Sequence, residues 1–117
     1  MLLKINRIPR PLFPLVMKKG KKYSSNNLFA RVVWLEEEHR DDPIRCSFVV
    51  SAKVSKSAVA RHRLKRLGYA IVRRNLHNTK KGVMVALFFT PTAADVPKNK
   101  LEAEIEELLH KTGVYEK

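Results

Sequence analysis

The segment that most constrains the fold is Val83–Thr90, whose sequence VMVALFFT is apolar at every position except the last. Gly82 precedes this run and Pro91 follows it, so the run has the length of one strand. A strand with one solvated face alternates apolar and polar residues, whereas a continuous apolar run indicates burial on both faces. We therefore expect this segment to be a central strand of a sheet.

Other segments have the composition of strands. Leu28–Leu35 (LFARVVWL) is rich in the β-branched and aromatic residues that favour strands, and Arg45–Lys53 (RCSFVVSAK) has a similar character. The charged residues of Glu36–Pro43 separate the two as a loop, so we expect these strands to form an antiparallel hairpin. Tyr23 and Ser24 add a short strand before them.

Three segments carry helical signals. A short helix is expected over residues 11–19, where a glycine follows the last residue. The second helix begins at a serine N-cap, either Ser55 or Ser57, and extends to about residue 76. The third covers residues 100–111, in which leucine and isoleucine recur at helical spacing before another glycine.

The predicted order of elements is α-β-β-β-α-β-α. This order favours an α+β fold, an α/β sandwich in which the helices pack on one sheet. A chain of 117 residues has the length of a single domain, so we expect one domain over residues 1–117, with residues 1–8 as an irregular N-terminal arm.

The net charge is unevenly distributed along the chain. The formal charge of +13 arises from 24 Lys and Arg against 11 Asp and Glu. Residues 1–82 carry 20 basic and 5 acidic side chains, whereas residues 83–117 carry 4 and 6. Because 44% of the residues are hydrophobic, the chain is not a disordered basic tail. The regional excess of positive charge indicates a polyanionic partner.

Several classes of protein are excluded by composition. A single cysteine, Cys46, rules out an internal disulfide framework and a multi-cysteine zinc or iron–sulfur site. No apolar run approaches the roughly 20 residues of a membrane span, and the prolines near the N-terminus do not fit a signal peptide. We expect a cytoplasmic protein with no membrane association.

The second predicted helix concentrates the basic residues. Seven Lys and Arg lie between Lys56 and Arg74, with no acidic residue among them. Four apolar residues form a stripe within about 60° on one side of this helix, and we expect the stripe to pack on the sheet. The stripe consists of Ala60, Leu64, Leu67 and Ile71. The basic face is too broad for a strip that reads one DNA groove, and it suits a folded RNA recognised by shape and backbone.

Residues 61–66 (RHRLKR), preceded by Ser51-Ala52-Lys53 and Ala58, resemble the Arg-Asn-Arg-x-Lys-Arg signature of the protein subunit of bacterial ribonuclease P. The N-terminal Arg7-Ile8-Pro9-Arg10, followed by Phe13, Met17, Lys18 and Gly20, is similar to the first segment of the same family. The length and the order of elements also match. The resemblance implies a sandwich like domain 2 of ribosomal protein S5, with a left-handed crossover.

The resemblance also implies a function. In this family, a catalytic RNA subunit with bound Mg²⁺ removes the 5′ leader of precursor tRNA, and the protein binds both RNAs in a 1:1 complex with the RNA subunit. Carried over to this chain, the basic helix contacts the catalytic RNA, and Phe13 and Met17 line a cleft for the leader. The protein itself supplies no catalytic or metal-binding residue. The candidate RNA-binding residues are Lys53, Lys56, Arg61, His62, Arg63, Lys65, Arg66 and Arg73.

Three departures from the family pattern stand out. His62 replaces the Asn of the signature, and Met17 stands where a second Phe is common. Gly68-Tyr69-Ala70 replaces an Arg-Glu continuation, and the glycine marks a bend or a close approach of RNA.

The remaining candidates favour structural roles. The four histidines lack metal-ligand spacing, and Cys46 is expected to be a packed thiol. The glutamates of residues 102–107 are expected to be solvated, and Phe13 has a second interpretation as ordinary core. The aromatic residues expected mainly in the core are Trp34, Phe48, Phe88 and Phe89. The alternative functions are a ribosomal or ribosome-assembly RNA-binding protein and a metal-dependent nuclease that acts alone.

Overall fold

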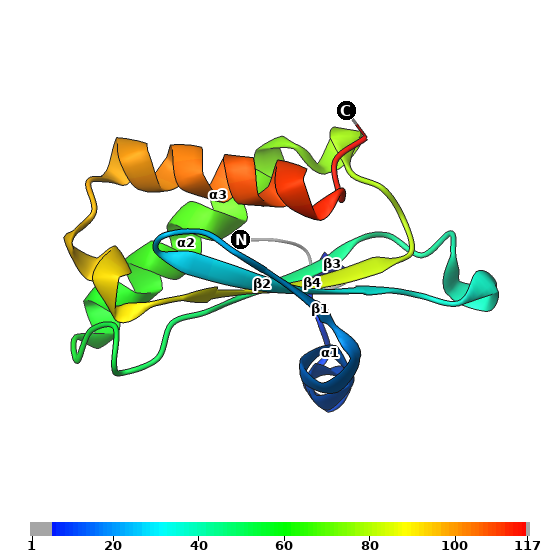
Figure 1. Cartoon of the computed structure of the whole chain (residues 1–117), viewed down its shortest axis with the longest axis horizontal. Helices are drawn as coiled ribbons and strands as arrows, with labels where there is room; N and C mark the ends of the chain where they lie inside the picture. Colours follow the sequence, from blue (N-terminus) through cyan, green and yellow to red (C-terminus); the bar gives the residue numbers. More distant parts are fainter. Residues whose placement is uncertain (1–5, 117) are drawn as a thin grey trace.

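Figure 1 shows the computed structural model, which describes residues 6–116. A four-stranded sheet lies between two layers of helix, with α2 (Ala58–Arg74) and α3 (Lys98–Thr112) on one face and α1 (Phe13–Lys19) on the other. The element order α-β-β-β-α-β-α and the α+β class are confirmed. Residues 1–5 of the predicted arm lie outside the described residues, and the side chains of Asn6 and Ile8 are buried.

The sheet has the order β1-β2-β4-β3. Strand β4 (Val83–Phe89) pairs antiparallel with β2 (Leu28–Trp34) and parallel with β3 (Arg45–Val49), and β1 (Lys21–Ser24) extends the other edge. Every residue of β4 is buried except Phe88, which is half-buried. The prediction of a central strand buried on both faces is therefore confirmed.

The predicted hairpin of β2 with β3 is wrong, because β4 lies between these two strands. An apolar strand with no polar face is best covered at the centre, where both of its edges and both of its faces find partners. Residues 35–44 are long enough to cross the intervening strand, since two strand spacings amount to about 10 Å. The connection from β3 through α2 to β4 joins parallel neighbours, and its handedness stays a prediction.

Two apolar cores fill the space on either side of the sheet. The larger lies under α2 and α3 and includes Leu28, Val85 and Leu108. The smaller lies under α1 and is centred on Val16 and Met84. No helix within residues 6–116 is both long enough and apolar enough to cross a membrane.

The apolar stripe predicted for α2 does not pack on the sheet along its whole length. The buried residues of α2 are Gly68, Tyr69, Ile71 and Val72. Leu64 and Leu67 are only partly buried, because the helix is rotated so that this part of the stripe turns toward α3. The sheet and α3 therefore share the apolar surface of α2.

Gly68 allows the close approach of α2 to the sheet. A Cβ atom at this position would lie 2.5 Å from carbons of the Phe48 ring. Next to it, the Phe48 backbone N–H donates to the Tyr69 hydroxyl at 3.1 Å, and the two rings meet edge to face with centroids 5.1 Å apart. The expectation that Gly68 marks an approach of RNA is wrong, because this residue is buried against Phe48.

Candidate nucleic-acid interface

The start of α2 is set by a serine N-cap. The Ser57 Oγ accepts a hydrogen bond from the Ala60 N–H at 3.2 Å, so Ser57 rather than Ser55 is the cap. No acidic residue lies in the first turn of α2. Arg61 and Arg63 lie within its first two turns. The N-terminus of a helix carries partial positive charge, and these arginines add to it. An external anion that binds at this end of α2 would therefore be stabilised by both the helix dipole and the arginines.

Most of the predicted RNA-binding side chains are accessible. The exposed members are Lys53, Lys56, His62, Arg63, Arg66 and Arg73. Arg61 and Lys65 are half-buried, and the Arg61 guanidinium donates to the Ser55 carbonyl oxygen at 2.8 Å. Arg61 therefore braces the loop before the helix. The strand β3 ends at Val49 and not at Lys53 as predicted. Lys53 therefore lies in a turn after the strand.

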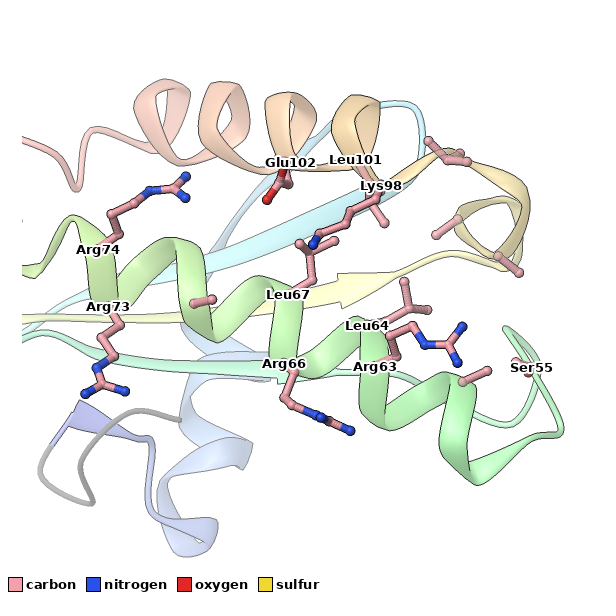
Figure 2. Close-up of a pocket in the computed structure, with 15 residues that line it drawn as sticks. Ser55, Arg63, Leu64, Arg66, Leu67, Arg73, Arg74, Lys98, Leu101 and Glu102 are labelled. Atoms are coloured by element: carbon pink, nitrogen blue, oxygen red, sulfur yellow. The ribbon is translucent and has the colours of Figure 1, made fainter.

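The arginines of α2 leave the helix in different directions. Figure 2 shows Arg66 and Arg73 on the side away from α3, whereas Arg74 extends toward α3. Arg74 pairs with Glu106 at 3.3 Å, which is the single ion pair of α2 within residues 6–116. Arg66 and Arg73 thus present exposed, unpaired guanidinium groups on one side of a rigid helix. A guanidinium donates two parallel hydrogen bonds to a phosphate, so this surface is suited to an RNA backbone.

The residues predicted to form the leader cleft lie on α1, on the opposite side of the sheet. Phe13 is half-buried and packs against the smaller core. The alternative prediction, that Phe13 belongs to the core, therefore agrees with its packing. Met17 is 41% exposed and offers a flexible apolar side chain at the surface.

An aromatic pair that is not among the predicted site residues lies on the same face of the sheet as α1. The rings of Phe29 and Phe88 stack with centroids 4.8 Å apart and an interplanar angle of 10°. The Lys22 ammonium lies 4.7 Å from the centre of the Phe29 ring. These three residues, called the stacked platform below, combine half-buried aromatic surface with a cation, the combination that binds unpaired nucleotides.

A signal for the stacked platform was present in the alternation of β2. Leu28, Ala30 and Val32 are buried, whereas Phe29 and Arg31 are half-buried and face the other way. An arginine on that face indicates a surface that is not closed core. Phe48 and Phe89 are buried as predicted, but the prediction of a core position is wrong for Trp34, which is 48% exposed.

The glutamates of α3 are less solvated than predicted. Glu104 accepts hydrogen bonds from the backbone N–H of Asn27 at 2.6 Å, from the Asn27 amide at 2.7 Å and from the Ser25 hydroxyl at 2.5 Å. Burial acts to raise the pKa of Glu104, but these hydrogen bonds outweigh it and leave the pKa below its ordinary value. Glu104 thus joins α3 to the turn between β1 and β2. The hydrogen bonds of Glu104 with Ser25 and Asn27 are called the clasp below.

The remaining titratable side chains do not gather into a second site. Cys46 is fully buried, and burial raises the pKa of its thiol far above the ordinary range, so the predicted packed thiol is confirmed. Within residues 6–116, no three His, Cys, Asp or Glu side chains form a group that could hold a metal ion.

Comparison with known proteins adds to this geometry. The family model described as Ribonuclease P matches residues 8–113, which is most of the chain. The chain belongs to the ribonuclease P protein family. The match spans the N-terminal segment, the whole sheet and all three helices, so ribonuclease P family membership rests on the entire fold and not on the basic helix alone.

Curated relatives support the same family. The ribonuclease P protein component of Rippkaea orientalis is 30% identical over 113 residues, covering 95% of this chain and 89% of the relative. That of Parasynechococcus marenigrum is 36% identical over 105 residues, covering 81% and 82%.

Solved structures of ribonuclease P proteins share the fold. The protein of Staphylococcus aureus matches with a TM-score of 0.84 at 19% identity, over 96% of this chain and 99% of that one. The protein of Thermotoga maritima matches with a TM-score of 0.75 at 23% identity, over 90% and 96%.

Proposed function

We propose that this chain is the protein subunit of a ribonuclease P, which binds a catalytic RNA and aids endonucleolytic removal of the 5′ leader from precursor tRNA. The observation that carries the proposal is α2, a helix with six basic and no acidic residues, in a member of this family. Phosphate contacts from several arginines and lysines give high affinity with a steep salt dependence, as a stable protein–RNA complex requires.

The two faces of the sheet have separate roles in this proposal. The catalytic RNA contacts the exposed side of α2 through Arg63, Arg66 and Arg73. Other basic residues contact the RNA at the edges of this surface, namely Lys53, Lys56, Arg61, His62 and Lys65. The single-stranded leader crosses the opposite face, beside Phe13 and Met17 of α1. There the stacked platform offers flat aromatic surface to the bases, and Lys22 offers positive charge to the backbone.

The chemistry belongs to the RNA subunit in this proposal. Mg²⁺ bound with that RNA would supply an activated water and would neutralise the charge that develops on the leaving oxygen. This chain binds and orients the substrate, and by placing positive charge along two RNA strands it lowers the Mg²⁺ concentration that the complex needs. The complex contains one protein and one catalytic RNA and acts in the cytoplasm.

Reconstitution from purified components tests the proposal. The chain and its cognate catalytic RNA are mixed with precursor tRNA at low Mg²⁺, and release of the 5′ leader is followed on a gel. We expect the chain to raise the cleavage rate strongly over RNA alone. Unchanged cleavage, or ribosomal RNA as the partner after native purification, would refute the proposal and favour a ribosomal role. Mg²⁺-dependent cleavage by the RNA-free chain would indicate a nuclease that acts alone.

A further inference from the structure

A groove of about 1030 Å³ separates α2 from α3 and from the short 3-10 helix η5 (Pro91–Asp95) that precedes α3. Its floor is aliphatic, with Leu64 and Leu67 from α2 facing Leu101 from α3 (Figure 2). Alanines contribute much of the rest of the lining, at Ala60, Ala70, Ala93 and Ala94. Because these side chains are small, the two helices do not close the space between them.

The rim of the groove carries both signs of charge. Arg63 lies at the end near Ser55, whereas Lys98 and Glu102 project from α3 toward the groove (Figure 2). Arg66 and Arg73 also border the groove, although their guanidinium groups are directed away from α3 (Figure 2), and Arg74 is engaged by Glu106. Among the described residues, the groove is therefore bordered by five basic side chains, one of them ion-paired, and by one carboxylate, Glu102.

This surface suits a protein helix better than RNA. The described residues that line the groove include no aromatic ring on which unpaired bases could stack, and its four arginines border a floor that is aliphatic. The Glu102 carboxylate repels phosphate, whereas a protein partner can answer it with a Lys or Arg. A second copy of the chain is disfavoured because it would bring two basic α2 helices together.

We propose that this groove binds an amphipathic helix of net acidic charge from a partner protein. Aliphatic side chains at positions i, i+3 or i+4 and i+7 would lie over Leu64 and Leu67, as in other helix-in-groove complexes. Carboxylates on its flanks would meet Lys98, and also Arg63 at the edge that the groove shares with the proposed RNA surface. Ala60 to Ala70 on α2 spans about 15 Å, enough for three turns of the incoming helix.

Site-specific photocrosslinking tests the proposal in the full chain. Ala94→p-benzoylphenylalanine places the probe at the groove, and Ala103→p-benzoylphenylalanine, also at an exposed alanine but outside the groove, is the matched control. We expect irradiation of cells that make the chain to yield a protein adduct from position 94 and not from position 103. The cross-linked segment, mapped by mass spectrometry, should be an acidic amphipathic helix.

A synthetic peptide of the mapped segment then provides an affinity. By fluorescence anisotropy, Ala94→Glu should weaken its binding at least tenfold, and Ala103→Glu should leave it unchanged. An RNA adduct, an adduct with a second copy, no adduct specific to position 94, or equal peptide binding by both variants would overturn the proposal. Precursor-tRNA cleavage by Ala94→Glu should equal that of the unmodified chain, so a failure here is distinguishable from a failure of the proposed function.

Discussion

At the scale of single residues, Arg66 offers the cleanest test of RNA binding by α2, because its side chain is exposed and points away from α3. Arg66→Ala should weaken binding of the catalytic RNA and reduce the slope of log affinity against log salt by about one. Filter binding over a series of salt concentrations measures both quantities.

The matched control for Arg66 is Arg40, an exposed arginine that pairs with Glu37 at 3.0 Å in the loop between β2 and β3. Arg40→Ala should leave the salt slope unchanged, because this loop is outside the proposed interface. Equal slopes for the original chain and Arg66→Ala would remove Arg66 from the contact surface.

Gly68 is the residue at which packing and helix propensity oppose each other. Alanine favours a helix over glycine by about 1 kcal/mol, but its Cβ would lie 2.5 Å from the Phe48 ring carbons, an overpacking that costs about 1–3 kcal/mol. Gly68→Ala should therefore lower the free energy of unfolding, measured by urea denaturation. In a Phe48→Leu background the same change should cost less, and an equal loss in both backgrounds would contradict the steric explanation.

At the scale of elements, the two faces of β2 carry different side chains. One face contributes to the core under α2 and α3, and the other face, on the α1 side of the sheet, carries the stacked platform. Phe29→Ala removes one of the two stacked rings. We expect a loss of about 1–3 kcal/mol in binding precursor tRNA with a leader, the usual contribution of one base–aromatic contact, and little loss with mature tRNA. Competition binding with the two RNAs measures the difference.

Trp34 provides the aromatic control for this prediction, since it is exposed at the end of the same strand and alternates onto the opposite face. Trp34→Ala should affect both RNAs equally or not at all. An equal effect of Phe29→Ala on the two RNAs would assign Phe29 a role in packing instead of leader binding.

The clasp between the β1–β2 turn and α3 predicts a pH-dependent stability. The pKa of Glu104 is lowered in the folded chain, so the carboxylate stabilises the fold above the ordinary pKa of about 4.3, and this contribution is lost as the pH falls through the lowered value. Glu104→Ala should cost about 1–3 kcal/mol near neutral pH, because the half-buried donors of Ser25 and Asn27 lose a charged acceptor.

Urea denaturation at several pH values checks the clasp. The difference between the original chain and Glu104→Ala should be largest near neutrality and should narrow below about pH 4. Glu107→Ala changes an exposed residue of the same helix and should show no such trend. A difference that is independent of pH would rule out the charged clasp.

At the scale of the whole molecule, the formal charge of +13 opposes folding until an anion binds. Sulfate at fixed ionic strength should raise Tm more than chloride does, because an anion that binds the native state stabilises it. The combined variant Arg63→Ala, Lys65→Ala, Arg66→Ala should lose much of this extra stabilisation. An equal gain in that variant would assign the effect to the general action of sulfate on hydration.

The local elements were largely predictable from the sequence. The apolar run of β4 identified the central strand, the serine before α2 identified its start, and both predictions are confirmed because they depend on neighbouring residues along the chain. The family resemblance, carried by residues 61–66 and the N-terminal segment, is also confirmed. Both predictions depend on residues close together in the sequence, so they do not require knowledge of the tertiary arrangement.

Pairing between distant segments was decided only by the tertiary structure. The order of the strands placed β4 between β2 and β3, and the position of α3 turned Leu64 and Leu67 from the sheet toward a groove. The same packing brought Phe29 onto Phe88 and the Ser25–Asn27 turn onto Glu104. A sequence states which side chains are available and with what period they recur. Which distant partner each side chain meets depends on long-range burial, because competing arrangements bury similar apolar surface and differ only once the whole chain is packed.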